Sequence, residues 1–172
     1  DRLYERGLQR QKFLPAIALL NQHTEVVNVD GGVDYRLQSL NKVPVFHCPL
    51  DQTSAQALSD LFGELTRGLH VEDDKLLDIV GRELKAICWA ENIVWFDFAM
   101  LCRGPRSAAD YIELARQYHT VFISSVPAFA EDQEDEARRF ITLIDEFYDH
   151  SVKVVNSAAV EISQLYQGDK LQ

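Results

Sequence analysis

The sequence contains few cysteines and no long apolar segment, and both shortages exclude classes of protein. Its three cysteines, Cys48, Cys88 and Cys102, lie far apart and include no CxxC pair. That spacing argues against a disulfide framework or a cysteine-based zinc site and favours reduced thiols in a cytoplasmic protein. The longest apolar runs, 13–20 and 152–155, are much shorter than the roughly 20 residues that cross a membrane.

Basic residues are outnumbered by acidic ones. The 172 residues include 17 Lys and Arg against 27 Asp and Glu, which gives a formal net charge of −10. A surface of this charge repels phosphate backbones and anionic lipids, which argues against non-specific nucleic-acid binding. Hydrophobic residues make up 47% of the chain and charged residues 26%, as is typical of a globular domain.

Residue patterns that bind phosphate or metal ions are also missing from the sequence. It contains neither GxxxxGK(S/T) nor GxGxxG, so no loop of this kind can hold the phosphates of a nucleotide. The five histidines never recur at a spacing of three or four residues, which argues against a zinc site on a helix. Asp30 and Asp34 flank two glycines without the further ligands of a calcium loop, so we expect a structural turn. Cys102 and His119 would need an orienting group and an oxyanion site to act as nucleophile and base, and the sequence indicates neither.

Hydrophobic periodicity predicts an α/β protein of mixed α+β character. Apolar residues at helical spacing indicate helices over 1–23, 53–68, 107–118 and 132–149, with Thr53 and Ser107 as the expected N-caps. Apolar, β-branched runs indicate strands at 24–29, 33–37, 43–48, 76–80, 84–89, 93–98, 119–126 and 152–155. Glycines in 30–32 and at Gly81-Arg82 predict turns, so we expect local hairpins. The last strand, helix and strand should form a right-handed crossover between adjacent parallel strands.

Six segments, in order along the chain, resemble the signatures of one ATPase family. They are 3–15 (LYERGLQRQKFLP), 30–36 (DGGVDYR), 96–102 (FDFAMLC) with Asp110-Tyr111, 119–122 (HTVF) with Val126-Pro127, 136–141 (EARRFI) and 166–169 (YQGD). Together they make the sequence similar to the ZapE/Afg-type family, a branch of the AAA-like P-loop ATPases. The resemblance covers essentially the whole chain.

This resemblance implies that the chain is the C-terminal half of an AAA-like P-loop NTPase, without the upstream Walker A and Walker B segments. Residues 1–23 would be the end of the ATPase core, 24–106 an α+β middle region, and 107–172 a strand-helix-strand C-terminal unit. The full-length protein would bind ATP and magnesium, self-associate and remodel a protein assembly, by resemblance the bacterial FtsZ division ring. The isolated chain should be catalytically inactive. The alternative is a non-catalytic protein-interaction domain.

The resemblance also points to one candidate catalytic residue, Arg10. In AAA-type rings an arginine downstream of the sensor strand reaches the neighbouring subunit's site, where its planar guanidinium bridges charge that develops on the γ-phosphate. Two alternatives stay open. Lys12 is the next basic position, although a lysine cannot make the bidentate contact, and Arg10 is otherwise a solvated charge near the start of a helix.

Arg138 and Arg139 form a second basic pair, which would suit phosphate sensing. Glu134 and Asp135 precede these arginines by four residues on the same predicted helix. Opposite charges at this spacing are neighbours on a helix surface. We therefore expect surface ion pairs rather than a phosphate site.

Overall fold

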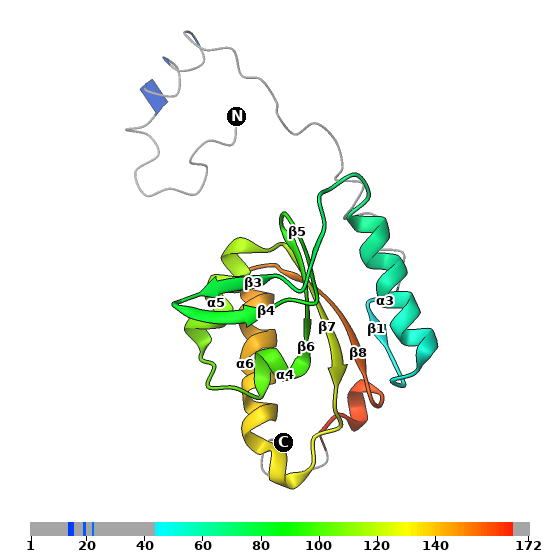
Figure 1. Ribbon diagram of the computed structural model, residues 1–172. Coiled ribbons are helices and arrows are strands. Elements are labelled where there is room, and N and C mark those ends of the chain that lie inside the picture. The colour runs from blue at the N-terminus through cyan, green and yellow to red at the C-terminus, as the bar shows by residue number, and fades with distance from the viewer. Residues whose placement is uncertain (1–13, 16–18, 20–21, 23–43, 167–172) are drawn as a thin grey trace. The chain divides into compact units, whose positions relative to one another are not determined.

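The computed structural model describes residues 14–15, 19, 22 and 44–166 (Figure 1). The predicted strands and turn within 24–37 lie outside these residues, as does most of the predicted helix 1–23. The chain divides into two compact units, residues 1–39 and 40–172. The fold below is that of the second unit, and the division into three functional regions stays a prediction.

A six-stranded sheet, in the order β1-β8-β7-β6-β5-β2, organises this unit. The four strands β1 (Phe46–His47), β8 (Lys153–Ala158), β7 (Thr120–Val126) and β6 (Ile93–Asp97) run parallel to one another. The short β5 (Cys88–Ala90) is antiparallel to β6, and β2 (Glu72–Asp73) is antiparallel to β5. This mostly parallel sheet with its helices confirms the predicted α/β class.

Strands β7 and β8 are adjacent and parallel, as predicted, and α6 (Glu134–Asp149) connects them. Their register places Phe122 opposite Val155. A single 3-10 turn, η1 (Glu131–Gln133), precedes α6, so the helix begins slightly later than predicted. A second crossover joins β6 to β7 through α5 (Ala108–Gln117), which was predicted, and α4 (Phe98–Cys102), which was not.

Helices cover both faces of the main sheet (Figure 1). Helix α3 (Gln52–Leu65) packs on one face, where its Leu58 and Phe62 join Phe122 and Val155 in one core cluster. Helices α4, α5 and α6 contribute to a larger cluster that contains Phe96, Val121, Ile123, Leu143 and Phe147. Successive residues of β7 thus enter different cores, as the alternation of side chains along a strand requires. Burial on both faces explains why the middle of this strand, 121–123, is a continuous apolar run.

The predicted strand 84–89 is wrong as a single element, because the chain changes sheets within it. β3 (Leu76–Ile79) and β4 (Arg82–Lys85) form a separate antiparallel hairpin. Its turn is Val80-Gly81, with φ of 53° and 71°, rather than Gly81-Arg82. The Ala86 amide still donates to Lys75 of the hairpin, whereas the Ile87 amide donates to Trp95 of the main sheet.

Asp51, and not Thr53, is the N-cap of α3. Its backbone is extended, and its Oδ1 accepts from the Ser54 amide at 2.8 Å. Aspartate caps a helix at least as well as threonine, so the earlier residue begins the helix. Ser107 is confirmed as the N-cap of α5, where its amide and hydroxyl donate to Asp110 at 2.7 and 2.9 Å.

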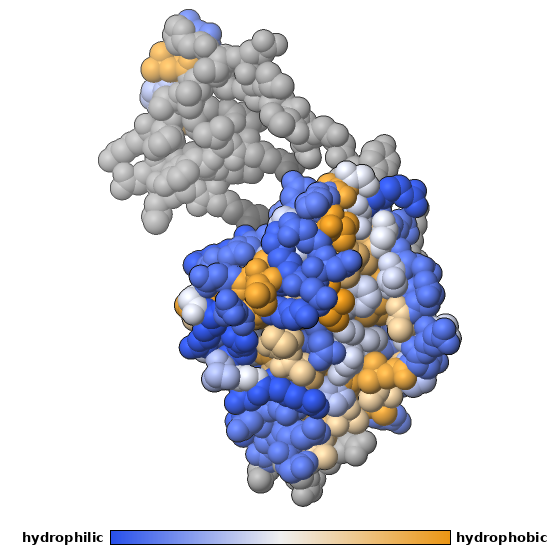
Figure 2. Space-filling model, in the orientation of Figure 1, coloured by the Kyte–Doolittle hydropathy of each residue, from blue (hydrophilic) through white to orange (hydrophobic). Residues whose placement is uncertain are grey.

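Hydrophilic side chains dominate the face of the second unit shown in Figure 2. Large apolar side chains are nevertheless exposed at a few places, including Tyr148 on α6 and Leu76 on β3. The part of the chain that the structure describes contains no helix with the length and apolarity of a membrane span.

Candidate functional site

The four parallel strands end at one edge of the sheet, and a crevice of ≈ 460 Å³ lies there against the first turns of α3. Open α/β sheets bind ligands outside the carboxyl ends of their strands, at the point where the connections change faces. Here β1 is followed by α3 on one face, whereas β6 and β7 are followed by helices on the other. We call this hollow the carboxyl-edge crevice.

Six polar residues from four elements line the carboxyl-edge crevice. They are Asp51 and Ser54 at α3, Asp97 at the end of β6, Ser124 and Ser125 in β7, and Ser157 in β8. Its remaining walls are Leu50, Ala55, Leu58, Ile87 and Trp95. Among the described residues, the lining includes no lysine, arginine or histidine.

Both carboxylates of the crevice are helix caps. Asp51 Oδ1 accepts from the Ser54 amide at 2.8 Å, and Asp97 Oδ1 accepts from the Ala99 amide at 2.9 Å at the start of α4. Neither carboxylate forms an ion pair with a described residue. Each carboxylate therefore has one oxygen occupied by a backbone donor, and a helix N-terminus, not a basic side chain, complements its charge.

A β-bulge places two consecutive serines at the crevice. The register between β7 and β8 shifts between Ile123 and Val126, and Ser125 has a φ of +65°. The Ser125 amide donates to the buried Ser157 hydroxyl at 3.3 Å. A left-handed backbone is unfavourable for serine, and such conformations and bulges concentrate at functional sites.

Trp95 forms the aromatic wall of the crevice. Its ring lies 5.7 Å from Phe62 and 5.8 Å from Phe122, centroid to centroid, which fixes it against α3 and β7. The indole Nε1 is buried and has no acceptor among the described residues. A ligand in the crevice would therefore meet an aromatic surface as well as carboxylates and hydroxyls.

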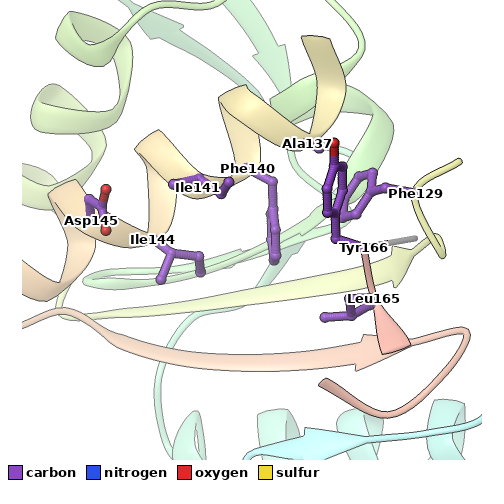
Figure 3. A pocket seen from close by; sticks show the side chains of 8 residues that line it. All are labelled: Phe129, Ala137, Phe140, Ile141, Ile144, Asp145, Leu165 and Tyr166. Carbon is purple, nitrogen blue, oxygen red and sulfur yellow. The ribbon is translucent and has the colours of Figure 1, made fainter. Parts of the chain in front are cut away.

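A second hollow, an apolar groove of ≈ 250 Å³, runs along α6 (Figure 3). The rings of Phe129 and Phe140, with Ile144 and Leu165, line most of it, and Asp145 lies at one end. The Phe129 amide donates to the Leu165 carbonyl at 2.7 Å, which holds the C-terminal segment beside the helix. Asp145 is the one charged side chain among the described residues that line this α6 groove.

The proposed finger residues Arg10 and Lys12 lie outside the described residues, so both assignments stay predictions. Arg139, predicted to form a surface pair, donates from Nη1 to the Cys102 carbonyl at 3.1 Å and so ties α6 to α4. A nucleophile–base pair of Cys102 and His119 is not formed. Burial raises the pKa of Cys102 to about 12, and His119 Nδ1 lies 2.7 Å from the Asn92 side chain.

Cys48 and His47 do not form a metal site either. The Cys48 thiol donates to Glu161 at 3.0 Å, a hydrogen bond that raises the pKa of Cys48. Among the residues described, no group of three or more His, Cys, Asp or Glu side chains could hold a metal ion. No sequence motif predicts the carboxyl-edge crevice, and the one signal for it is the polar residues that directly follow buried strands.

Comparisons with known proteins place the whole chain in one family. The model of the AFG1-like ATPase family matches residues 1–172. The chain is 44% identical over 173 residues to cell division protein ZapE of Escherichia coli (strain K12), which covers 100% of the chain and 46% of ZapE. It is 35% identical over 167 residues to lactation elevated protein 1 homolog B of Danio rerio, across 96% of the chain and 33% of that protein.

The chain thus spans about half the length of the curated bacterial relatives that it matches, or less for the fish protein. No solved structure matches it. The predicted resemblance is confirmed by both the family model and the sequence identities. The chain belongs to the AFG1-like ATPase family.

Proposed function

We propose that this chain is the C-terminal, phosphate-loop-free part of a ZapE-like ATPase, and that the complete protein couples ATP hydrolysis to remodelling of a protein assembly in the cytoplasm. The whole-chain family match carries this proposal. The name of the bacterial relative supports a role in cell division, and within that role we propose the FtsZ division ring as the assembly. Self-association follows from the proposed role of Arg10 at a neighbouring subunit.

ATP and magnesium belong, in this proposal, to the part of the protein that carries the phosphate loop. The sequence has no GxxxxGK(S/T) loop. The carboxyl-edge crevice does not replace that loop, because its lining offers two carboxylates and no basic side chain to a triphosphate. The described lining of the crevice therefore does not fit the phosphates of a nucleotide.

Phosphate release tests the assignment. The complete protein should release phosphate from Mg-ATP, and residues 1–172 alone should release none above background. A complete protein that folds but neither hydrolyses ATP nor binds it would contradict the proposal. Catalysis by the isolated chain would contradict the assignment of the chemistry to the other part.

A non-catalytic interaction domain is the second candidate function. The α6 groove favours it, because Ile141 at its rim is 46% exposed and Asp145 has no ion-pair partner in the described part of the chain. Such a groove fits a protein segment with an apolar side chain beside a lysine or arginine. The sequence encoded upstream of residue 1 distinguishes the two candidate functions. A strand there that ends in GxxxxGK(S/T) would support the ATPase.

A further inference from the structure

We infer that the carboxyl-edge crevice binds an organic cation, an ammonium or guanidinium group on an aliphatic chain, through Asp51 and Asp97. This inference is independent of the proposed ATPase role, because it concerns a site that contains no phosphate-binding group. It starts from the position of the crevice, at the edge of the sheet where α/β proteins bind ligands. The charges of the lining then select the kind of ligand.

The electrostatics of the crevice favour a cation. The described part of its lining holds two carboxylates and no lysine or arginine, and the whole chain has a net charge of −10. The positive end of α3 is already complemented by Asp51, so it cannot attract an anion as an uncapped helix would. A phosphate would face like charges, whereas an ammonium or guanidinium would form charge-assisted hydrogen bonds.

The size and walls of the crevice favour an organic ligand over a bare metal ion. A volume of ≈ 460 Å³ lies within the range of small-molecule pockets, which is roughly 300–1,000 Å³. No cluster of three or more metal-ligating side chains occurs among the described residues. Leu50 and Ile87, which line the crevice and are exposed, offer apolar surface to methylene groups, and Trp95 offers an aromatic surface to a cation.

The serines of the bulge complete the site. Ser124 and Ser125 both line the crevice, and the buried Ser157 hydroxyl accepts from the Ser125 amide. Each hydroxyl oxygen can accept a further hydrogen bond from an ammonium or guanidinium group. Ser125 has an unfavourable left-handed backbone, with φ of +65°, at the place where its hydroxyl lines the crevice. Unfavourable backbone conformations of this kind concentrate at ligand sites.

Trp95 provides the readout for a direct test. The chain has two tryptophans, so Trp89→Phe leaves Trp95 as the single emitter, at the wall of the crevice. Agmatine and spermidine are the small-molecule probes, and a capped peptide with one arginine is the protein-like probe. Each should change Trp95 emission saturably, and added salt should weaken the binding. Binding of the amines alone identifies a free small molecule, and binding of the peptide as well identifies a basic side chain of a partner.

Asp51→Asn and Asp97→Asn should each weaken the binding by about tenfold, because an amide keeps the helix cap but removes the charge. Asp145→Asn, in the α6 groove, is the matched control and should leave it unchanged. Thermal melts by circular dichroism confirm that each variant is folded. The inference is overturned if no probe gives a saturable change, if both Asn variants bind the probes normally, or if inorganic phosphate binds more tightly than agmatine. None of these results depends on ATP hydrolysis, so the proposed function is tested separately.

Discussion

At the scale of single residues, Arg10 has the most specific expected role. In the complete ATPase, Arg10→Ala should leave ATP affinity nearly unchanged, while turnover falls by on the order of 10³ to 10⁵. The physical reason is that a finger residue meets charge that develops mainly in the transition state. Steady-state hydrolysis and nucleotide titration measure the two quantities separately.

Lys12→Ala is the control for Arg10, because Lys12 is the other candidate for the finger position. If Lys12→Ala alone abolishes turnover, the assignment to Arg10 is wrong. Mixing Arg10→Ala subunits with subunits that have a defective phosphate loop should restore some activity, since some interfaces then combine an intact site with an intact finger. Assembly without any rescue would exclude action in trans.

The buried thiol of Cys102 should make stability depend on alkaline pH. Burial raises its pKa from 9.0 to about 12, so the folded protein holds the proton more tightly than the unfolded chain. This contribution is fully present below pH 9.0 and is lost as the pH rises toward 12. Urea denaturation at increasing pH should show the loss, and Cys102→Ala should reduce it. An unchanged alkaline slope in that variant would contradict this account.

The left-handed backbone of Ser125 should lower the free energy of unfolding of the protein. Ser125→Gly should raise the free energy of unfolding by about 0.5–1 kcal/mol, because relief of a left-handed serine exceeds the entropy cost of glycine. Ser124→Gly, at the neighbouring position without a positive φ, should lower it by about 0.5–1 kcal/mol. Thermal or urea unfolding of both variants provides the comparison, and equal destabilisation would show that Ser125 is not strained.

At the scale of elements, the start of α5 depends on a single buried carboxylate. Asp110 is 1% exposed and accepts from the Ser107 amide, the Ser107 hydroxyl and Arg82, all within 2.9 Å. Asp110→Ala removes these acceptors and should lower the free energy of unfolding by about 1–3 kcal/mol. Glu113→Ala, on the same helix and paired with Arg116 at 3.8 Å, should cost less than about 1 kcal/mol. Equal effects in chemical denaturation would refute the special role of Asp110.

The elements that the sequence predicted best are long and strongly patterned. The β-branched runs at β7 and β8 and the helical period at α6 predicted these three elements. The predicted parallel pairing of β7 with β8 is confirmed. α4 was missed because five residues are too few to show a helical period. The predicted strand 84–89 is wrong because its residues form hydrogen bonds with two different sheets. The composition of the segment does not show where this change occurs.

The carboxyl-edge crevice was beyond sequence reasoning for a different reason. Asp51, Asp97, Ser125 and Ser157 come from separate elements, and only the strand order brings them to one edge. The φ of Ser125 also depends on the bulge between β7 and β8, which no local pattern encodes. Arg10, by contrast, was identified through family resemblance, and its role still requires the kinetic test.

At the scale of the whole molecule, we expect this chain to supply no nucleotide site of its own to an AFG1-like ATPase. Titration calorimetry with Mg-ATP tests it most directly, with residues 1–172 and the complete protein compared under the same conditions. We predict saturable binding by the complete protein and no saturable heat from the isolated chain, because the phosphate-binding loop is absent from its sequence. Micromolar binding of Mg-ATP by the isolated chain would contradict the account.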